Sequence, residues 1–254
     1  MANYQALAKE ARKKVLEMIH SAGTSHIGSN FSVIDIATVL YENVDLKKDR
    51  VVWSAGWKAA TIYYFLEKKG VLPTGSCDTF CKPGSQLIGL AEDEVPGVHA
   101  SGGAMGHGLP VAVGMAYELK RQEKEGTVFC VMSDGEMDEG TTWEAAALAA
   151  HHKLDNLVVL IDKNNWQAMG RPGDILNMEP LGDKWESFGW EWNEHDGHDF
   201  EIIEAVLRKK HSQPYVFIAE TTKGKGVSFM EDAIIWHYSH VDDETYKKAM
   251  AELE

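Results

Sequence analysis

Two short apolar runs, separated by a strong helix former, constrain the fold of this chain more than any other feature. The first run is Thr127–Met132 (TVFCVM) and the second is Leu157–Ile161 (LVVLI), with the helix former Thr141–His152 between them. Almost uniformly apolar strands are typical of a parallel sheet that is covered on both faces. A third such run, Tyr215–Glu220, follows a predicted helix at 200–210. The alternation predicts an α/β fold: a doubly wound, mostly parallel sheet with helices on both faces.

The remaining sequence predicts further helices around this sheet. Apolar residues at helical spacing indicate a helix at Tyr4–Ser21 that stops at Gly23, and a second helix at Ser32–Tyr41 with Ser32 as its N-cap. The other expected elements are a short strand at Arg50–Trp53, a helix at Lys58–Lys69 and a helix from about Pro110 to Lys124. No linker or internal repeat interrupts the chain, so we expect a single domain over residues 1–254.

Charge and composition exclude several classes of partner. The formal net charge of −14 argues against binding nucleic acid through a basic surface. No apolar run approaches the ~18 residues that a membrane span needs, and the N-terminus lacks the apolar core of a signal peptide. Three cysteines fit a reducing compartment better than a disulfide framework. We therefore expect a cytoplasmic protein with neither nucleic acid nor membrane as a partner.

Polar residues follow two of the predicted strands at the point where each strand ends. Asp134 comes almost directly after the first apolar run, and Asn164 comes just after the second. Ligands bind at the carboxyl ends of strands in a doubly wound sheet, and the intervening helix brings these two ends together. A carboxylate and a carboxamide oxygen suit Mg²⁺, with phosphate oxygens completing its shell, and Gly135 allows close approach to the backbone. Asp134-Gly135 alone, or Asn164-Asn165 alone, would be read as an ordinary turn. Together, at the same edge of the sheet, they predict a metal site.

These segments resemble the thiamine diphosphate motif of transketolases, which reads G-D-G, a spacer of under about thirty residues, and N-N. The matching stretches are Ser133–Gly140, the helix from Trp143 to Asp155, and Ile161–Asn165. Other blocks resemble the same family in the same order: Ser21–Gly28, Ser101–Gly108, Asp196–Asp199, Thr221–Gly226 and Trp236-His237. The blocks span nearly the whole chain. The resemblance implies the thiamine-diphosphate-binding fold of the diphosphate-binding (PP-type) domain.

The resemblance also implies the cofactors, thiamine diphosphate and Mg²⁺, and the residues that hold them. It assigns the metal to the side chains of Asp134 and Asn164 and to the main-chain carbonyl of Trp166. The cofactor-binding residues that it implies are Gly103, Ala104, Met105, Asp134, Gly135, Asn164 and His237. The cofactor would carry a two-carbon ketol unit from a ketose donor to an aldose acceptor.

Three catalytic residues follow from the resemblance, and each has a plainer alternative. His26 matches a histidine that faces the substrate, although in its Gly/Ser-rich loop it could be a surface residue. His237 matches one that reaches substrate and diphosphate, and the alternative is aromatic packing beside Trp236. Glu139 matches a carboxylate near the dimer axis, and it would also favour a helix N-terminus. Lys223 could face phosphate or lie in a solvated loop.

The chain covers only the first of the three domains that a full transketolase carries. The resemblance implies that the pyrimidine-binding and C-terminal domains, with the carboxylate that activates the cofactor, lie on a separate chain. We therefore expect an α2β2 assembly in which the partner is a C-terminal transketolase subunit, and no activity of this chain alone. Three positions depart from the family: Ser133 replaces a glycine, while Trp57 and Leu90 replace histidines. These changes favour a non-standard sugar or sugar phosphate as substrate.

Two other functions stay open from the sequence. A subunit of a 2-oxoacid dehydrogenase first component shares the fold and the cofactor motif, although the blocks around His26 and Lys223 look more like transketolase. A non-catalytic cofactor-binding partner is the second alternative, because Ser133, Trp57 and Leu90 are altered. Nicotinamide binding is excluded, since no G-x-G-x-x-G follows the first strand with an acidic residue about twenty residues on.

Overall fold

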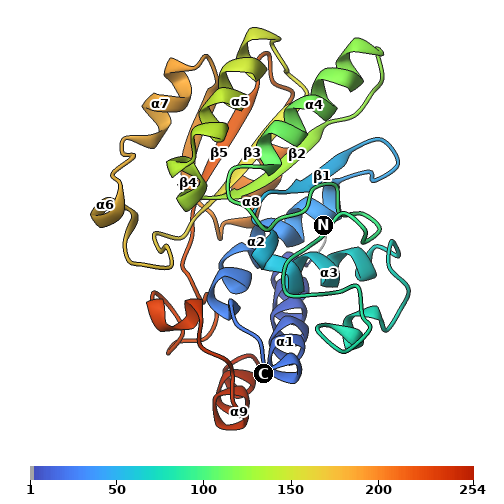
Figure 1. Ribbon diagram of the computed structural model, residues 1–254, viewed down its shortest axis with the longest axis vertical. Coiled ribbons are helices and arrows are strands. Elements are labelled where there is room, and N and C mark those ends of the chain that lie inside the picture. Colours follow the sequence, from blue (N-terminus) through green and yellow to red (C-terminus); the bar gives the residue numbers. More distant parts are fainter. Residues whose placement is uncertain (1–2) are drawn as a thin grey trace.

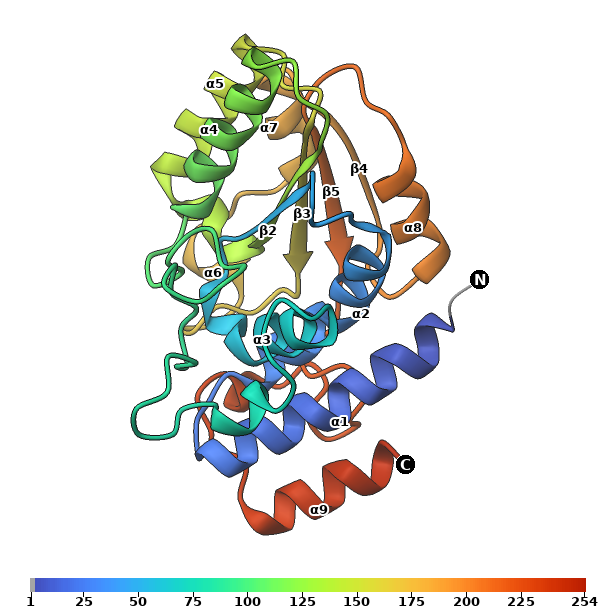
Figure 2. The ribbon, with the colours of Figure 1, turned by 90° about the vertical axis from the view of Figure 1, so that its right-hand side faces the viewer.

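Five parallel strands form one sheet at the centre of the molecule, in the order β1-β2-β3-β5-β4 (Figures 1 and 2). The computed structural model describes residues 3–254, so the first two residues of the predicted domain lie outside the described part. The strands are β1 (Arg50–Trp53), β2 (Val128–Ser133), β3 (Leu157–Lys163), β4 (Glu191–Asp196) and β5 (Tyr215–Glu220). The predicted parallel α/β sheet is confirmed.

Helices cover both faces of the sheet, which confirms the doubly wound arrangement (Figure 2). Side chains of β2 alternate between two apolar clusters, with Cys130 in one and Phe129 and Val131 in the other. The first cluster is completed by α4 (Gly108–Arg121), α5 (Gly140–His151) and α7 (Leu181–Ser187). The second is completed by α1 (Tyr4–Ala22), α2 (Ile27–Asn43), α3 (Ala59–Lys68), α8 (Phe200–Arg208) and α9 (Asp243–Glu252).

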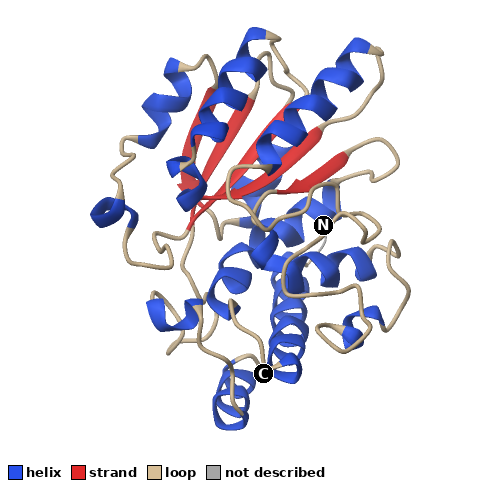
Figure 3. Cartoon of the chain, in the orientation of Figure 1, coloured by secondary structure: helices blue, strands red, loops and turns tan. Residues whose placement is uncertain are grey.

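Long loops lie on the side of the sheet where the strands end (Figure 3). The irregular segment from Lys69 to His107, interrupted by a short 3-10 helix at Ser76–Thr79, passes this edge. The segment after β3 does so too and contains the short helix α6 (Pro172–Ile175). Loops at the carboxyl ends of parallel strands are where ligands bind in doubly wound folds. Among residues 3–254, no helix has the length and apolar character needed to cross a bilayer.

Three local predictions were wrong or incomplete. Helix α2 begins at Ile27 rather than at Ser32, and His26 at its start has the left-handed φ of 70°. Ser32 is therefore an internal, buried residue that donates to Asp162 at 2.6 Å instead of capping the helix. The Ser133–Gly135 turn continues into a 3-10 helix at Asp134–Asp138. The edge strand β4 was not predicted, because its sequence EWNEHD has none of the uniform apolar character of the other strands.

Candidate functional site

A cavity of about 300 Å³ opens at the carboxyl ends of β2 and β3. Most of the predicted site residues line it: His26, Gly103, Met105, Asp134, Gly135, Asn164, Trp166 and His237. Ala104 and Glu139 lie outside this lining. Ala104 is an exposed residue of the same loop, and Glu139 precedes α5 with its Cβ close to Gly106 at the end of that loop. The fold thus brings together residues that are up to 211 positions apart in the sequence (237 minus 26).

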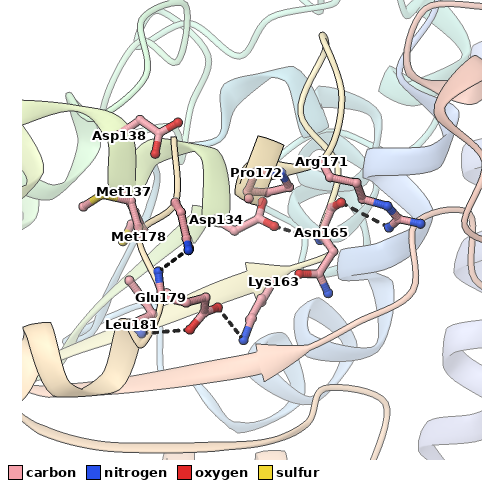
Figure 4. Close-up of a pocket in the computed structure, with 12 residues that line it drawn as sticks. Asp134, Met137, Asp138, Lys163, Asn165, Arg171, Pro172, Met178, Glu179 and Leu181 are labelled. Carbon is pink, nitrogen blue, oxygen red and sulfur yellow. Dashed lines mark hydrogen bonds and ion pairs between the residues drawn. The ribbon is translucent and has the colours of Figure 1, made fainter. Parts of the chain in front are cut away.

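Asp134 connects the ends of β2 and β3. In the sheet register Ser133 pairs with Asp162, so Asp134 lies beside the residues that follow β3. The backbone N–H of Asn165 donates to Asp134 Oδ2 at 2.7 Å (Figure 4). The Gly135 N–H donates to Oδ1 at 3.0 Å. Asp134 also borders a second cavity, beneath the segment 165–181, where Lys163 is paired with Glu179 (Figure 4). The Asp134 carboxylate therefore borders both cavities.

The charge around Asp134 suits a divalent cation. Burial, and then the negative charge of Asp162, raise the pKa of Asp134 to about 7, although the N–H group of Asn165, the charge of Lys58 and the N–H group of Gly135 oppose this. Among residues 3–254, no lysine, arginine or histidine forms an ion pair with Asp134. A buried carboxylate without a cationic partner is costly, and a bound metal removes that cost. The oxygens of Asp134 and Asn164 provide the hard ligands that Mg²⁺ prefers, so these residues fit the metal.

Asp162 lies behind the cavity and accepts hydrogen bonds from four side chains. Its Oδ2 accepts from Ser32 at 2.6 Å, from Asn164 Nδ2 at 3.1 Å and from the ammonium of Lys58, while its Oδ1 accepts from the hydroxyl of Thr221. Asp162 and Lys58 are both fully buried. Burial alone would raise the pKa of Asp162, but the charge and hydrogen bond of Lys58, with the two hydroxyls, hold it below its ordinary value.

His26, His237 and Lys223 form a basic cluster in which the lysine is fully buried and the two histidines are half-buried at the cavity wall. The two imidazole rings meet edge to face with centroids 5.3 Å apart. Lys223 Nζ lies 3.1 Å from His237 Nδ1 and donates to Ser29 Oγ at 3.1 Å. Lys223 is fully buried, so the solvated-loop alternative for it is wrong. Its aliphatic stem passes close to Gly28, and its ammonium lies behind Ser29 and His237, which line the cavity.

Burial and neighbouring cations set the protonation of this cluster. Burial, followed by the charges of Lys223 and Lys58, lowers the pKa of His26 to about 4. The same effects, with His26 added, lower the pKa of His237 to about 3. Burial and the charge of Lys58 lower the pKa of Lys223 to about 8. Near neutral pH both histidines are neutral and Lys223 is mostly a cation, so the cluster offers a charge for an anion and neutral imidazoles for proton transfer.

The Gly-rich loop 101–108 forms another wall of the cavity. Gly102 packs on Gly56 so tightly that a Cβ on Gly56 would lie 2.3 Å from Gly102 Cα, which requires glycine at this contact. The fully buried carboxylate of Glu136 accepts from the N–H of Gly106 at 3.0 Å and from the N–H of Ser133 at 2.8 Å. The loop is therefore tied to the end of β2 on the side of the cavity.

The three departures from the family pattern have different structural consequences. Ser133 has φ −112° and ψ 161°, an extended conformation that does not require glycine, so the change is tolerated by the backbone. Trp57 and Leu90 both line the cavity. At the two positions where the resemblance implies imidazoles, large and mostly apolar side chains thus line the cavity.

Trp166 is held in place on the loop after β3. Its N–H donates to Asn164 Oδ1 at 3.2 Å, and its indole Nε1 donates to Asp232 Oδ1 at 2.7 Å. Arg171 stacks on the indole at 3.6 Å and pairs with Asp232. These contacts join the segment that carries Asn164 to the segment between Lys223 and His237.

Four buried residues of the site were not predicted from the sequence as members of it: Ser29, Lys58, Glu136 and Asp162. Two of them had a detectable signal. Asp162 is a charged residue directly after an apolar strand, and Lys58 interrupts an otherwise apolar helix start. A charge in such a position is rarely buried without a partner. The partner itself is 104 positions away and becomes visible only in the fold.

Comparison with known proteins identifies the relatives of this chain. Residues 3–253 match the family model described as transketolase, thiamine diphosphate binding domain. The chain is 36% identical to an apulose-4-phosphate transketolase subunit of Phocaeicola vulgatus, over 97% of this chain and 92% of that protein. It is 35% identical to 6-deoxy-6-sulfo-D-fructose transketolase subunit SqwG of Clostridium sp., over 98% of this chain and 96% of that protein.

A solved structure agrees with these matches. Transketolase from Campylobacter jejuni superposes with a TM-score of 0.93 at 29% identity, over 100% of this chain. The match covers 43% of that chain, so this chain spans less than half of a full-length transketolase. The relatives named here are transketolases or transketolase subunits, which favours that family over a 2-oxoacid dehydrogenase.

Proposed function

This chain belongs to the transketolase family, as its thiamine diphosphate-binding domain, and from this premise we propose that it is the diphosphate-binding subunit of a two-chain, Mg²⁺-dependent transketolase. The observation that carries the proposal is the single cavity that Asp134 and Asn164 share with His26 and His237. That cavity joins a site for a cation to neutral imidazoles. A cofactor with a diphosphate at one end and a reacting ring at the other needs both.

The oxygen atoms at the ends of β2 and β3 are the proposed metal ligands. The Asp134 carboxylate, the Asn164 carboxamide oxygen and the main-chain carbonyl of Trp166 would hold Mg²⁺, and diphosphate oxygens would complete the shell. The absence of an ion pair to Asp134 within residues 3–254 supports this assignment. Gly135 lines the same cavity and leaves room for a diphosphate against the backbone.

The rest of the cavity provides contacts for the cofactor and the substrate. The loop residues Gly103, Ala104 and Met105 would lie against the cofactor. Ser29 would contact its diphosphate, and the charge of Lys223, behind Ser29 and His237, would attract it. When bound, thiamine diphosphate supplies the electron sink that makes ketol transfer possible. His26 and His237 would donate to or accept from the reacting oxygen atoms as neutral imidazoles. Glu139 would act between paired sites, since it lies beside the loop rather than in the cavity.

A second polypeptide should complete the active site. Two relatives that this chain matches over nearly their full length are named as subunits, which implies a partner chain. We propose that the partner carries the pyrimidine-binding and C-terminal domains, that the pair assembles as α2β2, and that residues 1–254 are a single domain of it. The free cysteines, Cys77, Cys81 and Cys130, are consistent with a cytoplasmic location, which we also propose.

The substrate should be a modified sugar or sugar phosphate. Trp57 and Leu90 place apolar surface at the cavity where the family offers imidazoles, and a site without those hydrogen-bond partners discriminates differently among sugars. The names of the relatives support this: one is a transketolase subunit for apulose 4-phosphate and another for 6-deoxy-6-sulfo-D-fructose. These two compounds are the first to test.

Reconstitution tests the proposal. This chain is purified alone and together with a candidate partner of about 300 residues, and both samples receive thiamine diphosphate and Mg²⁺. We expect ketol transfer from the complex only, with a modified sugar preferred to ordinary pentose and hexose phosphates. Turnover by this chain alone would refute the two-chain site. Cofactor binding by the complex without transfer from any donor would favour a non-catalytic partner instead.

A further inference from the structure

The carboxamide of Asn164 is held at both of its ends. Nδ2 donates to Asp162 Oδ2 at 3.1 Å, and Oδ1 accepts from the backbone N–H of Trp166 at 3.2 Å. A reversed carboxamide would place its oxygen against a carboxylate and its NH₂ group against an N–H. Both contacts would then be repulsive. The observed orientation is therefore the one that the surroundings permit, and it leaves a second lone pair on Oδ1.

Asp162 is itself held in place by Lys58, a partner that is buried away from solvent. Lys58 and Asp162 are fully buried, and the ammonium of Lys58 contacts Asp162 Oδ2 and the main-chain carbonyl of Ser29. The hydroxyls of Ser32 and Thr221 occupy other positions around the same carboxylate. Every donor comes from a different part of the chain, so α2, the start of α3, β3 and the end of β5 all converge on Asp162.

We propose that the Lys58–Asp162 pair is the positioning device of the cation site, because it locks the Asn164 carboxamide with Oδ1 available to a metal. The pair would not touch the metal. It would act through the hydrogen bond from Asn164 Nδ2, as residues behind metal ligands commonly do. This inference rests on the proposed function, since it assumes that Asn164 binds Mg²⁺.

The substitution Asp162→Asn tests the proposal. It removes the charge and replaces an acceptor-only group by one that also donates, so the Asn164 carboxamide can reverse. We expect the affinity for Mg²⁺, measured by calorimetry on the two-chain complex with thiamine diphosphate, to fall about 10–100-fold. The matched control is Asp155→Asn, at the opposite end of β3, where the exposed carboxylate pairs with Lys120. That control should bind Mg²⁺ like the wild type.

A second variant separates positioning from a loss of folding. Asp162→Asn leaves Lys58 as a buried, unpaired charge, which lowers stability. The double variant Lys58→Met/Asp162→Asn removes both charges and should unfold at a higher temperature than the single variant. Its Mg²⁺ affinity should nevertheless stay about 10–100-fold below that of the wild type.

The ratio of Mg²⁺ to Ca²⁺ affinity gives a readout that a purely structural role would not change. Mg²⁺ requires near-ideal octahedral geometry, whereas Ca²⁺ tolerates irregular sites. A loosened Asn164 should therefore weaken Mg²⁺ binding more than Ca²⁺ binding in both Asp162 variants. A folded double variant with wild-type Mg²⁺ affinity and an unchanged ratio would overturn the proposal. Failure of the wild-type complex to bind Mg²⁺ with the cofactor would instead refute the proposed function.

Discussion

The backbone N–H of Asn165 donates to Asp134 Oδ2 at 2.7 Å and so joins the ends of two neighbouring strands. Asp134 accepts only backbone N–H groups from the described residues, and Asp162 lies near enough to raise its pKa. The ends of β2 and β3 are therefore held together around a carboxylate that lacks a cation. This arrangement is expected of a site that trades stability for ligand binding.

Asp134→Asn should separate stability from function. The substitution removes a buried negative charge that has no ion-pair partner, but it turns an NH₂ group toward the backbone N–H of Gly135 or of Asn165. The two effects oppose each other, so the stability of the unbound protein should stay within about 1 kcal/mol of the wild type. Mg²⁺-dependent binding of thiamine diphosphate should fall by more than about 100-fold, because changes behind a metal ligand alone cost about 10–100-fold. Urea unfolding and calorimetry measure the two effects. A variant that binds the cofactor normally would contradict the assignment.

Lys223→Met should weaken binding of the diphosphate. Methionine fills most of the space of the lysine stem, but the ammonium beside Ser29 and His237 is lost. The attraction between partly buried opposite charges several ångströms apart is about 1–3 kcal/mol at an effective dielectric constant of about 20, so the affinity for thiamine diphosphate should fall roughly 10–100-fold. Thiamine without phosphate serves as the control ligand, and its weak binding should not change. Equal losses for both ligands would show that the lysine acts on the cavity as a whole.

The two histidines should contribute a loss of stability as the pH falls below neutral, while Asp134, whose pKa is raised to about 7, contributes with the opposite sign in the same range. Burial and nearby cations lower the pKa of His26 to about 4 and of His237 to about 3 in the folded state. In the unfolded chain both titrate near ~6.5. As the pH falls below this value the unfolded state binds protons first, so the free energy of unfolding falls until the folded-state pKa values are reached.

Urea unfolding at neutral and mildly acidic pH measures this effect. In the variant His26→Gln/His237→Gln, the loss of stability between the two pH values should be smaller than in the wild type. Lys223→Met should also reduce it, because removing the nearby charge lets the folded-state pKa of both histidines rise. An identical pH dependence in all three proteins would show that partial burial and the nearby cations do not lower the pKa of these histidines in the folded state.

Leu90→His should shift the choice of donor sugar. Leu90 lines the cavity, and the resemblance to transketolases implies a donor-facing histidine at this position. One added hydrogen bond of about 1.4 kcal/mol corresponds to a tenfold gain in kcat/KM for ordinary ketose phosphates. Trp57→His tests the other replaced imidazole in the same assay, and Ile88→His, on an exposed neighbour of Leu90, is the control. If Leu90→His and Ile88→His gave the same kcat/KM for ordinary ketose phosphates, Leu90 would not contribute to donor specificity.

The central part of the fold could be predicted because its physical signal is local. The strands β2, β3 and β5 are continuous apolar runs, and Asp134 and Asn164 follow the first two directly, so their meeting at one edge follows from parallel pairing. The edge strand β4 has a mixed, half-exposed sequence, and no periodic pattern marks it. Its position depends on pairing with β5, which is a property of the whole sheet.

The buried polar network could not be predicted because it depends on contacts between distant residues. Lys58 and Asp162 are separated by 104 positions, and Lys223 reaches Ser29 across 194. In the sequence Lys223 lies between glycines and polar residues, a composition that is typical of solvated loops. Only the packing of its stem beside Gly28 places it in the interior. The role of Ser32 also depends on a distant residue, because its hydroxyl donates to Asp162 instead of capping a helix.

The most direct test of the cation site is a crystal structure of the two-chain complex grown with thiamine diphosphate and Mn²⁺ in place of Mg²⁺. The anomalous signal of manganese locates the metal independently of the protein atoms. We predict one strong anomalous peak in contact with a carboxylate oxygen of Asp134, Oδ1 of Asn164 and the main-chain carbonyl of Trp166, next to the diphosphate. A peak elsewhere, or a diphosphate bound away from Asp134 and Asn164, would contradict the account.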